Sequence, residues 1–343
     1  MRLVQLGLSV SASRIALGIA SAALLVSACH VPGTSASGPA SGAQITVGVV
    51  PSVDDAPLHV AAEEGLFRAQ GLNVTIKTYS SLSPEIHALT NGQVDIAAGD
   101  YADFFYEQAT GRASLHLIAD GYDATSSVME LLTLPGSGIT TPQNLSGKTV
   151  ATPEAQVIQP GGGPGSCASD DAPYSIETLA TESVLQSDGV SPTTVCWKPT
   201  PAPDLIEELR SGRVNAILAT EPYILEAESQ LGAVELLDSC SGVTTDLPLS
   251  GYFSLATYAR THAPALAAFQ SVLQTAQAKS AMRGPVQAAL PSFAGISAQD
   301  AALITLGTYP TFLSVGQVQR VADLMYNSGM ISAPLNVSSL VSG

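Results

Sequence analysis

The sequence predicts an α/β fold of two similar lobes, and three observations support this. A chain of 343 residues, 45% of them hydrophobic, is long enough for two cores of ordinary domain size. From Gln44 onward, short β-branched runs alternate with helical patterns, which is typical of parallel sheets flanked by helices. Residues 89–95 (LTNGQVD) are echoed at 209–215 (LRSGRVN), and each copy ends a helix with glycine and begins a buried strand.

Each element of the first half begins and ends at residues that favour its type. Pro57 suits the first turn of a helix and Gly71 suits its exit, and Ser83 before Pro84 predicts a second helix start. The predicted order is strand 45–50, helix 57–71, strand 72–80, helix 83–92, strand 94–99 and helix 102–111.

The second half repeats this alternation. Its first helix exits at Gly189, and another helix follows Pro222. The predicted order is strand 148–152, helix 175–188, strand 194–200, helix 203–212, strand 214–220, the helix after Pro222 and strand 234–240. After Thr245 the pattern is helical, with long stretches at 264–282 and 316–325. The apolar stripes of this tail predict packing against the first lobe.

The N-terminus has the pattern of a secretory signal. Its apolar stretch, residues 15–26, follows two arginines and is too short to span a bilayer. Residues 26–29 (VSAC) resemble the bacterial lipobox, in which the cysteine thiol becomes diacylglyceryl-modified before cleavage. We therefore expect residues 1–28 to be a lipoprotein signal peptide and Cys29 to anchor the protein at the outer face of the bacterial cytoplasmic membrane. Ordinary signal cleavage beside an incidental cysteine is the alternative.

The rest of the chain divides into a tether and two lobes. Residues 29–43 start at the lipidated cysteine and continue with glycine, serine, alanine and proline, which is typical of a flexible tether. We expect residues 44–135 and 246–343 to form lobe 1, and residues 136–245 to form lobe 2.

Three cysteines follow the tether, an odd number in a compartment that permits disulfides. One disulfide and one free thiol is the simplest arrangement. Cys167 lies in a loop rich in glycine and proline that needs a tie, so we favour the pair Cys167–Cys196, while pairs that involve Cys240 stay open. Since no CxxC spacing occurs and the histidines are scattered, we expect no metal site and no cofactor.

The charge balance and the missing motifs exclude several function classes. Acidic residues outnumber basic ones 29 to 13, which gives a net charge of −16 and no electrostatic basis for a nucleic-acid partner. The chain has no HExxH and no GxSxG pattern, and the glycine run 161–163 lacks the Lys and Ser/Thr of a phosphate-binding loop. We therefore expect a binding protein that is not an enzyme.

Several short motifs, in a specific order, resemble solute-binding proteins of ABC importers, in the branch that serves nitrate, sulfonates, taurine and the pyrimidine precursor of thiamine. These motifs are APLHVAAEEGLFRAQGLNVTI, ALTNGQVDIAAGDY, LSGKTVATP, LRSGRVNAILATEPYI and SGYFSLAT. The resemblance runs from about residue 45 to 335. The loop at 154–173 is a departure, because it looks longer than the connection that the family usually has there.

The resemblance implies a bilobal periplasmic-binding-protein fold of type II. Its two lobes are joined by two crossing strands, which we place near 133–138 and 246–252. It also implies that a monomer captures a small solute by hinge closure and delivers it to a membrane permease. An enzyme or a sensor lipoprotein on the same bilobal fold is the alternative.

Ligands of open α/β sheets bind beyond the carboxyl ends of the strands, so the candidate ligand residues are those at the strand-to-helix turns. For each of them, capping of its own helix is the alternative, above all for Asp55 and Ser83. The candidates are Ser52, Asp54, Asp55, Ser80, Ser81, Ser83, Asp100, Tyr101, Thr152, Glu154, Thr220, Glu221 and Tyr252.

The charges of this set indicate the type of solute. Five of its members are acids, and Lys198 is the nearby base, so a plain oxyanion would be repelled. An amine-bearing or heteroaromatic solute could use the carboxylates as acceptors and stack on Tyr101, Tyr252 or Trp197, although Trp197 also suits the core of lobe 2. We expect a small nitrogen- or sulfur-containing organic solute, amino-pyrimidine-like or sulfonate- and taurine-like.

Overall fold

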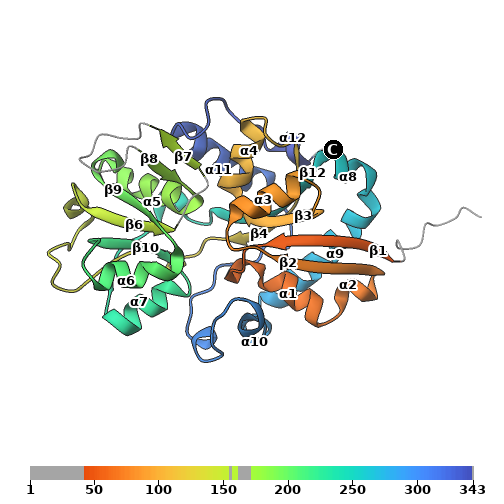
Figure 1. The fold of residues 1–343 in the computed structure, drawn as a ribbon, viewed down its shortest axis with the longest axis horizontal. Coiled ribbons are helices and arrows are strands. Elements are labelled where there is room, and N and C mark those ends of the chain that lie inside the picture. Colours follow the sequence, from red (N-terminus) through yellow and green to blue (C-terminus); the bar gives the residue numbers. More distant parts are fainter. Residues whose placement is uncertain (1–41, 154–156, 161–170, 342–343) are drawn as a thin grey trace, which may run out of the picture. The chain divides into compact units, whose positions relative to one another are not determined.

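The computed structural model describes residues 42–153, 157–160 and 171–341, which belong to one compact unit. Its strands form two five-stranded sheets and one two-stranded sheet (Figure 1). Within the described ranges, no helix is long and apolar enough to cross a membrane. The predicted signal peptide, most of the tether, Glu154 and Cys167 lie outside the described residues.

The first sheet has the strand order β2-β1-β3-β12-β4. Its first three strands are parallel, and β12 pairs antiparallel with both β3 and β4. The register of the parallel part sets Ala43 beside Leu72 and Val47 beside Ile96. The strands are β1 (Ala43–Val49), β2 (Leu72–Thr78), β3 (Ile96–Asp100), β4 (Leu115–Asp123) and β12 (Pro248–Leu255).

Helices cover both faces of the first sheet (Figure 1). On one face, Leu58, Phe67 and Phe269 form an apolar core with strand residues such as Ile45. These side chains come from α1 (Ala56–Glu63), α2 (Leu66–Ala69) and α9 (Ala263–Ser280). The other face packs against α3 (Leu82–Thr90), α4 (Tyr101–Ala109) and α11 (Val315–Asn327). The remaining helices of the C-terminal part are α8 (Ala256–Thr261), α10 (Arg283–Phe293) and α12 (Ser338–Val341).

The second sheet has the strand order β11-β5-β10-β6-β9. The strands are β5 (Met129–Thr133), β6 (Thr149–Pro153), β9 (Cys196–Thr200), β10 (Ala216–Thr220) and β11 (Val234–Asp238). The helices of this part are α5 (Ile176–Ser187), α6 (Leu205–Arg210) and α7 (Tyr223–Leu231). Between β6 and α5, β7 (Val157–Pro160) and β8 (Asp171–Tyr174) form the two-stranded sheet.

The chain passes between the two sheets twice. Because β5 pairs with β10 and β11, the first passage lies between Asp123 and Met129, earlier than the predicted crossing near 133–138. Met129–Thr133 therefore belongs to the second sheet, although the predicted boundaries assign it to lobe 1. The chain returns to the first sheet between Asp238 and Pro248.

The two copies of the internal repeat make matching hydrogen bonds in the two sheets. Asp95 donates its N–H to the Thr46 carbonyl (2.8 Å), and its Oδ2 accepts from the Thr46 N–H (2.7 Å). Asn215 makes the same pair of contacts with Thr149, at 2.8 Å and 3.0 Å. Each copy thus ties the start of its strand to a neighbouring strand, so β3 corresponds to β10 and β1 to β6.

Two predicted helix boundaries need correction. The helix expected from Ser83 begins at Leu82 with Ser81 as its N-cap residue, so Ser83 lies in the first turn and is exposed. The helix expected over 57–71 is divided into α1 and α2 at Gly65, which has a φ of 70°. A left-handed residue interrupts the helical backbone, and glycine adopts that conformation without steric penalty.

The described cysteines differ in state. Cys196 is disulfide-bonded, whereas Cys240 is a buried free thiol. Since Cys167 lies outside the described residues, its pairing with Cys196 stays a prediction.

Candidate functional site

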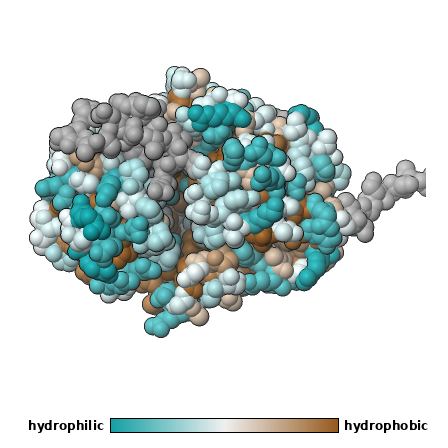
Figure 2. All heavy atoms as spheres, viewed as in Figure 1, coloured by the Kyte–Doolittle hydropathy of each residue, from teal (hydrophilic) through white to brown (hydrophobic). Residues whose placement is uncertain are grey.

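A cavity of about 490 Å³ lies between residues of the two sheets. Its walls come from the segments that follow β1, β2 and β3 on one side, and β6, β9 and β10 on the other. Figure 2 shows a hollow in the surface between the parts of the molecule that hold the two sheets. The cavity therefore lies beyond the carboxyl ends of parallel strands, where open α/β sheets bind ligands.

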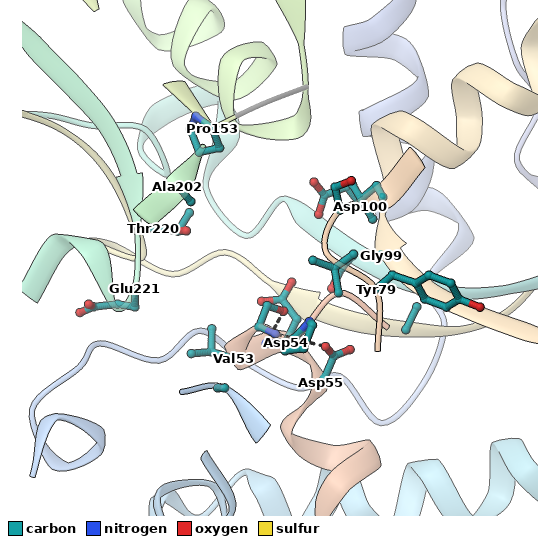
Figure 3. A pocket seen from close by; sticks show the side chains of 18 of the residues that line it. Val53, Asp54, Asp55, Tyr79, Gly99, Asp100, Pro153, Ala202, Thr220 and Glu221 are labelled. Carbon is teal, nitrogen blue, oxygen red and sulfur yellow. Dashed lines mark hydrogen bonds between the residues drawn. The ribbon is translucent and has the colours of Figure 1, made fainter. Parts of the chain in front are cut away.

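The turn after β1 presents Asp54 to this cavity. Ser52 caps the turn, because its hydroxyl accepts from the Asp54 N–H (3.3 Å) and its own N–H donates to Asp55 Oδ2 (3.3 Å). Ser52 and Asp55 thus hold the turn together, and Asp55, although it is the N-cap residue of α1, makes no side-chain capping bond to that helix. The Asp54 side chain lies beside Asp55 at the cavity wall (Figure 3).

The turn that begins α5 has the same form in the second sheet. Ser175 caps it together with Thr178, whose N–H donates to the Ser175 hydroxyl at 3.3 Å. Counted from the capping serine, Glu177 therefore takes the place that Asp54 has in the first sheet. Glu177 lines the cavity and was not predicted. The repeated Ser-x-acid pattern could have identified it, but the long segment between β6 and α5 hides the correspondence.

Asp100 ends β3 and is the N-cap residue of α4, yet its side chain makes no capping hydrogen bond. Figure 3 shows its carboxylate directed toward the side of the cavity that Thr220 and Pro153 occupy. Thr220 lies five residues after Asn215, as Asp100 does after Asp95, so these two are the equivalent positions of the repeat.

Glu221 lines the cavity but is bound by the protein itself. Its Oε1 accepts from the Thr305 N–H (2.8 Å) and its Oε2 from the Leu225 N–H (3.2 Å). In Figure 3 its carboxylate points away from Asp54 and Asp100. Glu221 therefore caps α7 and holds the loop that contains Thr305.

Tyr252 supplies a buried hydroxyl to the cavity wall. Its side chain is 1% exposed, and its hydroxyl has no hydrogen-bond partner among the described residues. Apolar groups complete the wall around it and opposite it, namely Pro201, Ala202, Pro203, Ala294 and Ile296.

Burial raises the pKa values of the carboxyl groups at this site. Desolvation, aided by the charge of Glu177, raises the pKa of Asp54 to about 6. Burial also raises the pKa of Asp100 well above its ordinary value, and the charges of Glu177 and Asp103 add to the effect. The pKa of Glu177 is raised by burial as well. Among the described residues, no lysine, arginine or histidine lines the cavity.

Most of the predicted ligand residues meet in this cavity. Those that line it are Ser52, Asp54, Asp55, Ser80, Ser81, Asp100, Thr220, Glu221 and Tyr252. Other residues line the cavity but were not predicted from the sequence, among them Tyr79, Glu177, Tyr223 and Ser250. Tyr79 and Ser250 carry no local sequence signal, because they lie inside a predicted strand and a predicted crossing.

Three predicted residues lie elsewhere. Tyr101 is fully buried in the core, where its hydroxyl donates to Asp120 Oδ1 (2.8 Å). Thr152 is fully buried in β6, and Ser83 is exposed on α3. Trp197 lies in the core of the second sheet and not at the cavity, which is the alternative that the sequence left open. Glu154 lies outside the described residues.

The model of the NMT1-like family matches residues 38–241 of this chain. No curated protein sequence is significantly similar to it.

Similar solved structures share the fold at low sequence identity. The periplasmic aliphatic sulphonate binding protein SsuA from Escherichia coli superposes with a TM-score of 0.66 at 17% identity, over 88% of this chain and 98% of that one. The alkanesulfonate-binding protein SsuA from Xanthomonas axonopodis pv. citri, bound to MOPS, gives 0.67 at 18% identity, over 88% and 99%. The desulfurization enzyme DSZB gives 0.61 at 12% identity, over 88% and 96%. These likenesses confirm the predicted periplasmic-binding-protein fold.

Proposed function

This chain belongs to the NMT1-like family, and on that premise we propose that it is the extracytoplasmic solute-binding component of an ABC importer. The observation that carries the proposal is the cavity of about 490 Å³, whose walls come from both sheets. This volume falls in the range of about 300 to 1,000 Å³ that is usual for small-molecule sites. A solute there would contact both halves at once and so favour a closed arrangement by hinge motion.

The solute we propose is a small organic molecule that contains nitrogen or sulfur. Asp54, Asp100 and Glu177 at the wall, without a basic side chain in the described lining, favour a nitrogen-bearing solute such as an amino-pyrimidine. A taurine-like solute fits through its amine, and a sulfonate without an amine fits less well. The closed form would then deliver the solute to a membrane permease.

The location of the protein is proposed from its sequence. Signal cleavage before Cys29 and its lipidation would hold a monomer at the outer face of the cytoplasmic membrane. The tether after Cys29 would let the binding unit reach a permease in the same membrane.

An enzyme is the second candidate, because the desulfurization enzyme DSZB has a similar fold. Binding without chemistry is better supported here. The described lining holds neither a cysteine nor a histidine, and its serines lie beside carboxylates without a histidine or lysine base. A serine nucleophile would therefore lack the histidine or lysine base that usually activates it.

Thermal unfolding of the purified protein against a solute panel tests the proposal. The panel contains taurine, alkanesulfonates, nitrate, amino-pyrimidines, thiamine and polyamines. A solute present at 100 times its dissociation constant should stabilise the folded state by about 2.7 kcal/mol. A rise of Tm with one class of compound supports the receptor function, and an unchanged Tm with every class contradicts it.

A further inference from the structure

Three carboxylates from both halves of the protein meet at one place in the cavity. Asp54 comes from the turn after β1, Asp100 ends β3, and Glu177 comes from the first turn of α5. All three also line an adjoining cavity of about 100 Å³, so they surround the point where the two spaces meet. We call these three residues the acidic triad.

Hydrogen bonds within the protein hold the neighbouring acids, and they also hold Asp54, through Ser250 and Ser52, and Glu177, through Ser175. Asp100 differs from all of these. Asp55 accepts from the Ser52 N–H, Glu85 from the Ala98 N–H (3.0 Å), and Glu221 from two N–H groups. Asp100, in contrast, makes no capping hydrogen bond although it occupies an N-cap position. Hydrogen bonding within the fold therefore accounts for the neighbours but leaves Asp100 open to the cavity.

A second observation indicates a ligand at the same place. Tyr252 lines the cavity and is 1% exposed, and its buried hydroxyl has no hydrogen-bond partner among the described residues. A buried polar group without a partner destabilises the folded state. A polar atom of a solute would satisfy this hydroxyl, and the acidic cluster alone does not explain why it is placed there.

Compensating positive charge is missing from the described part of the site. Arg283 is the basic residue whose positive charge interacts with the Glu221 carboxylate, and its guanidinium donates a hydrogen bond to the Ile304 carbonyl. Arg283 does not line the cavity. Closing the two halves around like charges is unfavourable unless protons or a positive group neutralise them.

We propose that the cavity selects an organic ammonium ion, whose positively charged N–H donors are shared by Asp54 and Asp100 from one lobe and Glu177 from the other. A primary ammonium carries three donors and no acceptor, so it can serve three carboxylates at once. The Tyr252 hydroxyl would bind a polar atom of the organic body, and the prolines at 201 and 203 would contact its apolar part. This inference rests on the proposed function and specifies the charge of its solute.

The same arrangement couples binding of the solute to release of protons from the triad. The carboxyl groups of the triad have raised pKa values, so each holds a proton more readily than an exposed acid does. An ammonium ion favours the ionised form and should release protons when it binds. The other titratable groups around the triad are acids or phenols, namely Asp55, Glu85, Asp103, Tyr122, Glu221, Tyr252 and Tyr309. None of these can supply the missing positive charge.

Matched pairs of probes separate charge from size. Putrescine and butanesulfonate share a four-carbon chain, and benzylamine and benzenesulfonate share a ring. Each probe is added at 10 mM to the purified protein at pH 7.5, and Tm and heats of binding are measured for the wild type and for D54N, D100N and E177Q. Asp188→Asn is the control, since Asp188 is exposed and remote from the lining.

We expect at least one amine to raise Tm and neither sulfonate to do so. Each triad substitution should weaken binding of that amine about tenfold or more, and Asp188→Asn should change it less than twofold. Lowering the pH from 7.5 to 5 should also weaken it about tenfold. The inference is overturned if a sulfonate binds better than its amine partner, if neither amine binds, or if the triad variants bind the amine as the wild type does. Binding of a sulfonate alone would leave the proposed function standing. If neither these probes nor the wider panel bind, both the proposed function and the selection of an ammonium ion are contradicted.

Discussion

The substitution Asp54→Asn should make the solute-free protein more stable at neutral pH. The pKa of Asp54 is raised from 3.8 to about 6, mainly by desolvation. The folded state therefore binds a proton more tightly than the unfolded state, and the free energy of unfolding decreases as the pH rises from about 4 to 6. A pKa difference of two units corresponds to about 3 kcal/mol. We take this as the upper bound on the stability gained by the substitution, because Asp54 is partly exposed. Asparagine resembles the protonated acid and carries no such penalty.

Urea unfolding of D54N and the wild type at pH 7.5 and 4.5 measures this effect. We expect D54N to be about 1–3 kcal/mol more stable at pH 7.5, with the midpoint shifted and the slope unchanged. At pH 4.5 the difference should shrink to less than half, because most wild-type molecules then carry the proton on Asp54. Asp188→Asn should show no such pH-dependent gain. Equal stability of D54N and wild type at pH 7.5, or a gain that does not change with pH, would show that the ionised Asp54 does not destabilise the folded protein.

Three further substitutions test the roles assigned to single side chains. Asn215→Ala should lower the free energy of unfolding by about 0.5–1.5 kcal/mol in urea, because the Thr149 N–H loses an acceptor at a solvent-exposed position; an unchanged midpoint would disprove the role of the repeat. Glu221→Ala should lower stability by about 1–3 kcal/mol, because the Thr305 N–H loses its partner, and a loss of solute affinity without a loss of stability would show that Glu221 is a ligand residue instead. Tyr252→Phe should weaken solute binding about fivefold to tenfold in a titration and leave the solute-free stability equal or higher, since the hydroxyl has no partner in the described structure; unaltered affinity would exclude it from the site.

The order of elements and the place of the site could be predicted because both follow from local patterns. The repeat around Asp95 and Asn215 has matching backbone contacts in the two sheets. Polar residues at the ends of β1, β3 and β10 do meet in one cavity, since carboxyl ends of neighbouring parallel strands lie at one edge of a sheet.

Side-chain direction and long insertions account for what could not be predicted. Tyr101 follows Asp100 directly, but the first turn of α4 directs its ring into the core, where Asp120 accepts its hydrogen bond. Thr152 lies in β6 at a fully buried position, and the sequence does not tell which face of that strand lines the cavity. Glu177 was missed because some twenty residues separate it from β6, whereas Asp54 follows β1 closely.

The central claim is that this cavity binds one small solute and releases it unchanged. The most direct measurement is a titration calorimetry experiment with the compound that raises Tm most, followed by mass spectrometry of the compound recovered after the protein is unfolded. We expect one site per chain, weakened binding in D100N, and full recovery of the compound with its original mass. Conversion of the compound to a product, or binding that D54N, D100N and E177Q all leave intact, would contradict it.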